Sequence, residues 1–313
     1  MAITPRWLKS MYDRGKNISA LMREQKGLSH NTEEIIEVSY DLHTGSYIYD
    51  MADERVSKYQ EIYTAEISKK ILSLCDPQSI LEAGVGEATT LSGVLKNLKK
   101  DVKSFGFDLS WSRSAYAKHW LQTQGINNVT LCTGTLFHIP FADNSIDVVY
   151  TSHSIESNGG NEEPILKELF RVARKFLVLI EPCYEIADEE QRRRMDFHGY
   201  CKNLKGIAVS LGYDIWEHRP MPFNANPLNP AAMTIIKKKA GVSPSSYYLA
   251  CPKFKTPLEE MGNILFSPEA LVAYPIVGGI PCLRMENGIF ASKYQEVVSG
   301  NYDLGSARKS TGA

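Results

Sequence analysis

A glycine-rich run in the first third of the chain has the residue types and spacing of a ligand-binding turn. In ILEAGVGEATT, the residues Glu82, Gly84 and Gly86 follow a short apolar stretch. Glycines allow a sharp turn between a strand and a helix, and they let a ligand approach the free N–H groups at the start of that helix. Taken alone, the pattern also fits a tight turn that binds nothing.

A second signal is Asp108, at the end of KSFGFDL. An acidic side chain about twenty residues beyond a glycine turn can accept hydrogen bonds from both hydroxyls of a ribose. An Asp in this place fits equally well as the N-cap of the next helix.

The third signal is the stretch TGTLFHIPFADNSIDVVYTSHSIE, which combines a strand end, a Pro-Phe loop and a strand that opens at Asp147.

Two histidines are candidates for moving a proton. His153 comes just after a predicted strand and shortly before Glu156, while His198 lies in the later run DFHGY. Either could instead be a hydrogen-bonded structural histidine. Glu181 and Tyr184 are weaker candidates, and Glu181 could also cap a helix or pair with the arginines at positions 192–194.

Alternating strands and helices must position these residues. Short apolar runs predict strands over 79–84, 103–109, 128–134, 146–152, 175–182, 214–220 and 231–239. Apolar residues at helical spacing predict helices over 53–74, 89–99, 112–125, 163–173 and 202–213. This alternation predicts an α/β fold, a doubly wound, Rossmann-like, seven-stranded sheet with crossover helices.

Composition narrows the class of protein further. The 313 residues carry a net charge of -1, which gives no global attraction to nucleic acid or to anionic membranes. We find no apolar run of the roughly twenty residues that a membrane helix needs, and no secretion signal. The six cysteines form no CxxC pair, as expected for reduced thiols in the cytoplasm. We therefore expect a cytoplasmic protein without metal, and a homodimer is compatible with the sequence.

Residues 59–239 resemble the class I S-adenosylmethionine-dependent methyltransferases, in particular the small-molecule branch that includes quinone-biosynthesis enzymes. The resemblance implies that S-adenosylmethionine is the cofactor and S-adenosylhomocysteine its product. It also implies that Glu82, Gly84 and Gly86 hold the methionine part. Asp108 matches the ribose ligand. In a nicotinamide-binding fingerprint a Gly or Ala would stand at Thr89, so the run favours methyl transfer.

The same resemblance places further residues around the cofactor. Leu109 and Leu136 match the apolar residues on the two sides of the adenine, and Thr135 stands where the family usually has an Asp that accepts the adenine amino group. His153 matches a position that lines the reactive methyl group. Tyr40 and Tyr47 resemble lid tyrosines that fold over the cofactor carboxylate, although they also fit simple aromatic packing.

The last part of the chain resembles a small zinc-ribbon-like activator protein of tRNA and protein methyltransferases. About forty residues match, chiefly through Tyr274-Pro275-Ile276 and Gly279-Ile280-Pro281. Of the first cysteine pair only Cys251 remains, because Phe254 replaces its partner. A tetrahedral zinc site needs four ligands, so we expect a metal-free segment that docks on its own methyltransferase domain.

These observations predict three regions: a helical lid over 1–52, a methyltransferase domain over 53–240 and an activator-like, β-rich segment over 241–313. The expected activity is methyl transfer to an oxygen or nitrogen of a small molecule, with His153 and His198 as catalytic candidates. One alternative is a catalytically silent protein that keeps the cofactor fold and binds a partner. Another is a tRNA or protein methyltransferase, although the neutral charge disfavours RNA.

Overall fold

The computed structural model describes residues 4–239, 241 and 243–302, and its centre is a seven-stranded sheet. The strand order is β3-β2-β1-β4-β5-β7-β6. The strands are β1 (Ser79–Ala83), β2 (Lys103–Asp108), β3 (Val129–Thr133), β4 (Ile146–Ser152), β5 (Ala173–Pro182), β6 (Asp214–Pro220) and β7 (Ala231–Lys237). The first five run parallel, whereas β7 pairs antiparallel with both β5 and β6.

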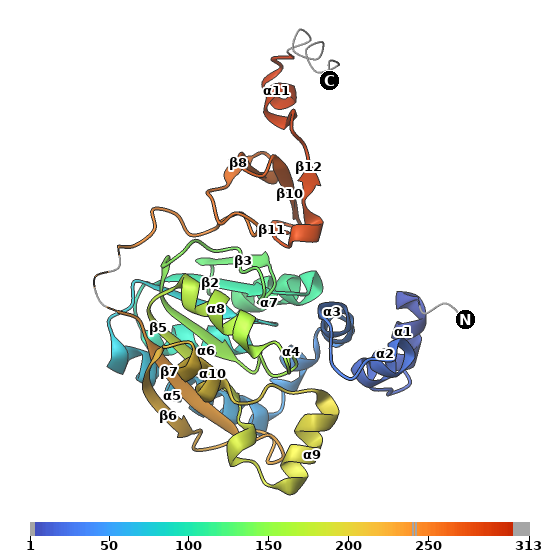
Figure 1. Ribbon diagram of the computed structural model, residues 1–313, viewed down its shortest axis with the longest axis vertical. Coiled ribbons are helices and arrows are strands. Elements are labelled where there is room, and N and C mark those ends of the chain that lie inside the picture. Colours follow the sequence, from blue (N-terminus) through green and yellow to red (C-terminus); the bar gives the residue numbers. More distant parts are fainter. Residues whose placement is uncertain (1–3, 240, 242, 303–313) are drawn as a thin grey trace.

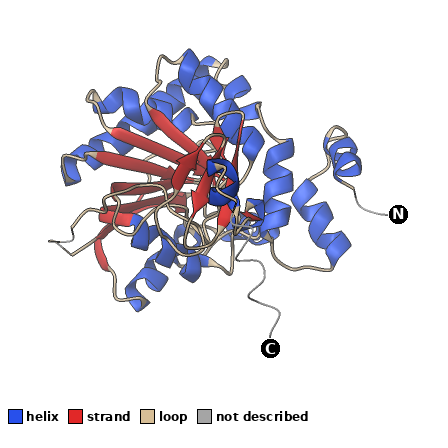
Figure 2. Cartoon of the chain, turned by 90° about the horizontal axis from the view of Figure 1, so that it is seen from above, coloured by secondary structure: helices blue, strands red, loops and turns tan. Residues whose placement is uncertain are grey.

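Helices cover both faces of this sheet (Figure 2). One face packs against α5 (Glu54–Leu74), α6 (Thr89–Leu98) and α7 (Trp111–Thr123), and the other against α8 (Glu162–Val172) and α10 (Leu204–Ser210). Residues such as Ile67 and Leu91 are fully buried on the first face, and Leu169 on the second. The predicted doubly wound, Rossmann-like α/β fold is confirmed.

The strand order fixes where a ligand can bind. β1 pairs with β2 on one side and with β4 on the other, so the direction of winding reverses at β1. In open α/β sheets, the crevice at the carboxyl ends of the strands beside such a switch point is the usual ligand site. The residues that follow β1, β2 and β4 therefore meet at this edge.

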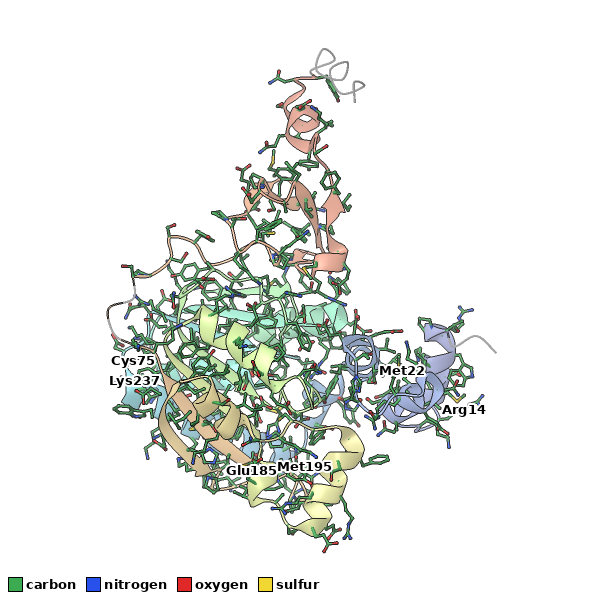
Figure 3. The ribbon with its side chains drawn as sticks, viewed as in Figure 1. Arg14, Met22, Cys75, Glu185, Met195 and Lys237 are labelled. Carbon is green, nitrogen blue, oxygen red and sulfur yellow. The ribbon has the colours of Figure 1, made fainter. Side chains whose placement is uncertain are left out.

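Four helices precede the sheet: α1 (Pro5–Tyr12), α2 (Ile18–Lys26), α3 (Glu33–Leu42) and α4 (Ser46–Asp50). The first three bury a small apolar core of their own, which includes Leu8, Ile18 and Ile35. Met22 lies in this core, to the side of the sheet (Figure 3). Farther along the chain, α3 and α4 lie close to α7 and to the strand ends (Figure 1).

The C-terminal segment forms a small, mainly antiparallel sheet that sits beside β3 (Figure 1). Its elements are β8 (Glu259–Met261), β9 (Ile264–Ser267), β10 (Val272–Val277), β11 (Ile280–Pro281), β12 (Ile289–Phe290), the short helix η2 (Met285–Asn287) and α11 (Tyr294–Ser299). The connection from β3 to β4 contains no helix, and the segment packs on the face that is left open there.

One stretch of the chain differs from the sequence-based expectation. The charged stretch after β5, for which we predicted no element, forms η1 (Tyr184–Ile186) and α9 (Glu189–His198). A capping box between Asp188 and Gln191 starts α9, while its mostly polar sequence gives no apolar period to detect. The expected domain boundary after residue 240 falls on a position outside the described residues. In the described part of the chain, no helix is long and apolar enough to cross a membrane.

Candidate active site

The loop after β1 forms a tight cradle whose glycines are sterically required. Gly84 and Gly86 have φ angles of 76° and 53°, in the left-handed region. A Cβ atom on Gly84 would lie 2.3 Å from the Cβ of Ser154, and one on Gly86 would lie 2.6 Å from Nη2 of Arg113. The backbone here can therefore be approached closely only because side chains are missing.

Asp108 holds this cradle against the end of β2. Its Oδ2 accepts a hydrogen bond from the Gly86 N–H, and its Oδ1 accepts one from the Ser110 N–H, both at 2.9 Å. The N-cap of α7 is Ser110, so the structure gives the capping role that we had considered for Asp108 to a neighbour. These two hydrogen bonds fix the position of the Asp108 carboxylate beside the glycine loop.

A cavity of about 420 Å³ opens at these strand ends, a size typical of ligand pockets. All of the residues that we expected to bind the cofactor line it: Tyr40, Tyr47, Glu82, Gly84, Gly86, Asp108, Leu109, Thr135, Leu136 and His153. The cavity continues past His153 to α9 and to the loop between β6 and β7, where Arg194, Asn226 and Asn229 form its far wall.

Glu82 is a buried carboxyl group in the wall of the cavity. Burial raises its pKa to about 8, and the hydroxyl of Tyr150, which donates to Oε2 at 3.0 Å, opposes the rise. The group therefore carries a proton for much of the time at neutral pH. An incoming cation would favour its ionised form.

Thr135 makes a contact that the sequence did not reveal. Its hydroxyl hydrogen bonds to Oε1 of Glu33, in the first turn of α3, and it also accepts the Phe137 N–H at 3.2 Å. Both Glu33 and Thr135 line the cavity. A carboxylate from the N-terminal helices thus stands beside the position where the related enzymes usually have an Asp.

The N-terminal helices close over the cradle through Tyr40 and Tyr47. The guanidinium carbon of Arg113 lies 5.3 Å from the ring centre of Tyr40 and 4.8 Å from that of Tyr47. The Tyr40 hydroxyl is 2.9 Å from Oγ of Ser157. These contacts place the two rings over a buried arginine, at distances suited to cation–π attraction.

His153 and Glu156 form a pair near the middle of the cavity. Nδ1 of His153 lies 2.9 Å from Oε2 of Glu156. Partial burial lowers the pKa of His153, but the hydrogen bond and charge of Glu156 outweigh it, so the pKa is raised above its ordinary value. His153 also has a φ of 55°, and a left-handed residue of this kind at a strand end is typical of functional sites.

Glu181 supports this pair. From the sequence we had considered an ion pair between Glu181 and the arginines at 192–194, but these residues, which the structure describes, do not form it. Its Oε1 accepts the Ser154 N–H and its Oε2 accepts the Glu156 N–H, each at 3.1 Å. Burial raises the pKa of Glu181 to about 7. Its carboxyl group therefore holds the backbone of the loop that follows β4 and carries His153.

His198 lies outside the cavity, which corrects its place among the catalytic candidates. Among the described residues, neither His198 nor Tyr184 lines the cavity. The His198 ring stacks on Tyr200 with 5.4 Å between the ring centres, and its carbonyl accepts from Nδ2 of Asn31 at 3.0 Å. The Tyr184 hydroxyl donates to Asp196. The C-terminal end of α9 is held by the N-terminal helices, and His198 lies behind Tyr200, which lines the cavity in its place.

Within the described residues, no group of three or more His, Cys, Asp or Glu side chains is arranged to hold a metal ion. Cys251, the remaining member of the activator-like cysteine pair, is fully buried, and its Sγ lies 3.8 Å from the hydroxyl of Tyr274. Phe254, at the position of the partner cysteine, is half exposed.

Comparison with known proteins finds a family model for the central domain and a short relative for part of the chain. Residues 80–175 match the family model described as a methyltransferase domain. Over 38 residues the chain is 50% identical to a UPF0434 protein of Vesicomyosocius okutanii subsp. Calyptogena okutanii. That match covers 12% of this chain and 64% of the relative, so the chain spans less than two thirds of the relative's length.

Solved structures with similar folds include a putative sarcosine dimethylglycine methyltransferase from Galdieria sulphuraria, with 12% identity, a TM-score of 0.47 and coverage of 58% of this chain and 86% of that one. The magnesium protoporphyrin IX methyltransferase of Synechocystis PCC 6803 is 12% identical, with a TM-score of 0.46 and coverage of 57% of this chain and 83% of that one. A complex of the Haloferax volcanii Trm112 methyltransferase activator with a putative methyltransferase gives 14% identity, a TM-score of 0.46 and coverage of 61% of this chain and 96% of that one.

Proposed function

Because this chain contains a class I S-adenosylmethionine-dependent methyltransferase domain, we propose that it methylates an oxygen or nitrogen atom of a small molecule. The observation that carries the proposal is the shape of the cavity. One continuous space joins the glycine cradle at the end of β1 to the pair formed by His153 and Glu156. A cofactor and an acceptor can thus lie end to end.

The residues of the cradle suit the cofactor. Nε of Arg113 and Oγ of Ser154 are buried and have no hydrogen-bond partner, although both residues line the cavity. Buried polar atoms are normally paired, so these two favour a polar ligand at this place. S-adenosylmethionine, when bound, supplies a methyl group on a positively charged sulfur.

Each part of the cofactor has a proposed partner in the chain. Glu82 would face the ammonium group of the methionine part, beside the backbone of Gly84 and Gly86. Asp108 would accept from the ribose hydroxyls with the lone pairs that its backbone contacts leave free. Leu109 and Leu136 would enclose the adenine, and Glu33 with Thr135 would meet its polar edge.

His153 is the proposed proton acceptor. An oxygen or nitrogen acceptor gives up a proton when it is methylated, and Nε2 of His153 would take that proton. Glu156 would orient the ring through Nδ1 and stabilise the resulting imidazolium ion. Tyr40 and Tyr47 would exclude water above the reacting atoms.

The size of the site also supports a small acceptor. Residues of α3 and α4 cover the cavity, and its walls come from the strand-end loops together with α5, α6, α7 and α9. Among the described lysines and arginines, only Arg113 and Arg194 line it, so it is not an open basic surface. We propose that residues 4–52 act as this lid, and that residues 243–302 dock permanently on the domain. Neither role requires a separate macromolecule.

Calorimetry with S-adenosylhomocysteine, followed by a transfer assay with methyl-labelled S-adenosylmethionine, tests the proposal. We expect micromolar binding, and label in the small-molecule fraction of a cell extract that has been depleted of its own enzymes. His153→Asn should still bind the product cofactor, which lacks the methyl group that His153 is expected to face, and should lose roughly 10²-fold or more in turnover, as expected for loss of a general base. Absence of cofactor binding, or label confined to RNA or protein, would contradict the proposal.

A further inference from the structure

The three consecutive arginines of α9 have different environments. Arg193 is exposed and pairs with Glu189 along the helix, and Nε of Arg192 donates to the carbonyl of Tyr184. Arg194 instead lines the cavity. A run that resembles a solvated helix face in the sequence therefore delivers one guanidinium group to the far wall of the site.

The guanidinium group of Arg194 is half-buried and hydrogen bonds to the Tyr200 hydroxyl, but one of its nitrogens has no partner. Its Nη1 is buried and has no hydrogen-bond partner, and no carboxylate among the described residues forms an ion pair with it. Its guanidinium carbon lies 5.5 Å from the ring centre of Tyr200. Burying an N–H group of a charged side chain without an acceptor is costly, so the arrangement favours a bound anion.

A second unpaired atom lies in the same part of the cavity. Oδ1 of Asn229 is buried and without a partner, while its Nδ2 donates to Oε2 of Glu156 at 3.4 Å. Oδ1 can only accept, so it suits an O–H or N–H group of a ligand. Asn229 also connects this wall to His153, because His153 contacts the same Glu156 oxygen.

These two unpaired atoms define what the acceptor must carry. We propose that the methyl acceptor is a small carboxylate that also bears a hydroxyl or amino group. Its carboxylate binds Arg194, and its O–H or N–H group points to Asn229 and the His153–Glu156 pair, where it is methylated. This inference rests on the proposed function and adds the class of the substrate.

Charge and geometry favour a carboxylate over a phosphate. A guanidinium group matches the two oxygens of a carboxylate in a planar, bidentate contact. Glu156, which contacts both His153 and Asn229, lies at this end of the cavity and would repel a dianion more strongly than a monoanion. Arg113 does not offset its charge here, because the ring contacts of Arg113 are with Tyr40 and Tyr47 over the cradle.

Calorimetry on the full chain saturated with S-adenosylhomocysteine tests the inference. The probes are 4-hydroxybenzoate, 2-aminobenzoate, 3-hydroxybutanoate and glycine, each beside its primary amide, with phenyl phosphate as the dianion. We expect one or more carboxylates to bind at least tenfold tighter than the matched amide. Arg194→Gln should remove that preference, Arg194→Lys should restore part of it, and the exposed Arg193→Gln should retain it.

The affinity for S-adenosylhomocysteine separates this inference from the proposed function. It should change less than twofold in Arg194→Gln, because the cradle lies at the other end of the cavity. Cofactor binding with no preference for carboxylates over amides, or with a preference that survives in Arg194→Gln, overturns the inference alone. Tighter binding of phenyl phosphate than of every carboxylate also overturns it. Failure of the wild-type protein to bind the cofactor overturns both.

Discussion

Glu82 shows how one residue can prepare a site for a charged ligand. A buried carboxyl group loses most of its hydration, and its pKa rises because the charged form is disfavoured. The Tyr150 hydroxyl and, more weakly, the charge of Arg113 offset only part of this cost. An ammonium group placed beside Glu82 would add a positive charge in direct contact and would lower the pKa further.

We therefore expect cofactor binding to release a proton from Glu82. With a pKa of about 8 in the free protein, Glu82 is mostly protonated at pH 7, and a bound ammonium should bring its pKa below 7. Calorimetric titration with S-adenosylhomocysteine at pH 7, in phosphate and in Tris, should show the release of up to about one proton.

The matched variant is Glu82→Gln, which keeps the shape and cannot ionise. It should bind the product cofactor more weakly, and its binding enthalpy should no longer depend on the buffer. Proton release of equal size in Glu82→Gln and in the wild-type protein would assign the proton to another group.

The sequence predicted the residues of the cradle well, but it did not predict the residues of the opposite wall of the cavity. Glu82 and Asp108 immediately follow apolar runs, so their chain positions alone place them at the ends of adjacent strands. Arg194 sits among three arginines, and nothing local distinguishes the one that turns inward. His198 was misplaced for a related reason, since contacts from Asn31, far away in the chain, set the direction of its turn.

At the scale of elements, one carboxylate ties the start of α4 to the cradle. Oε1 of Glu87 accepts the Gly45 N–H and its Oε2 accepts the Ile48 N–H, both at 3.0 Å, so it satisfies two donors at the start of α4. Glu87 directly follows Gly86 in the cradle. The lid and the proposed cofactor loop are therefore connected through one side chain.

Replacing Glu87 with Gln should loosen the lid without unfolding the domain. The amide keeps one acceptor oxygen but presents N–H groups to a backbone donor, which should cost the closed lid about 1–3 kcal/mol. Hydrogen exchange of the Gly45 and Ile48 amides should become faster, and affinity for S-adenosylhomocysteine should fall roughly 5- to 100-fold.

The control for this change is Glu34→Gln, which alters an exposed carboxylate of the N-terminal helices that pairs with Lys26. Exposed ion pairs contribute about 0–1 kcal/mol, so its exchange and affinity should resemble those of the wild-type protein. Unchanged exchange at Gly45 and Ile48 in Glu87→Gln would show that Glu87 does not hold the lid.

The elements themselves were largely predictable because their patterns are local. The five parallel strands are short apolar runs between turn residues, and the structure confirms each of them within a few positions. Helix α9 was not predictable, because it shows little apolar periodicity and buries mainly Met195. The position of α9 was not predictable either, because it depends on contacts of Arg23 and Asn31 with the last carbonyl groups of the helix.

For the whole molecule, the C-terminal segment takes the place of a missing crossover helix. The ring of Tyr248 packs on Phe105 of β2 with 4.7 Å between centres, and Ala142 donates its N–H to the Tyr248 carbonyl. Lys255 pairs with Glu168 of α8, and Nε1 of Trp111 donates to the carbonyl of Val277. The segment thus completes the core on one face of the sheet.

This shared core predicts that the segment and the domain unfold together. Tyr248→Ala removes a half-buried ring from the junction, so it should lower the free energy of unfolding by about 2 kcal/mol, less than for a fully buried aromatic residue. The loss should shift a single transition, observed alike by tryptophan fluorescence and by far-ultraviolet circular dichroism in guanidinium chloride. Phe254→Ala, in the same segment but half exposed, should change stability by no more than about 0.5 kcal/mol. Two separate transitions, with Tyr248→Ala moving only the weaker one, would show instead that the segment folds independently and that the sheet retains its own core without it.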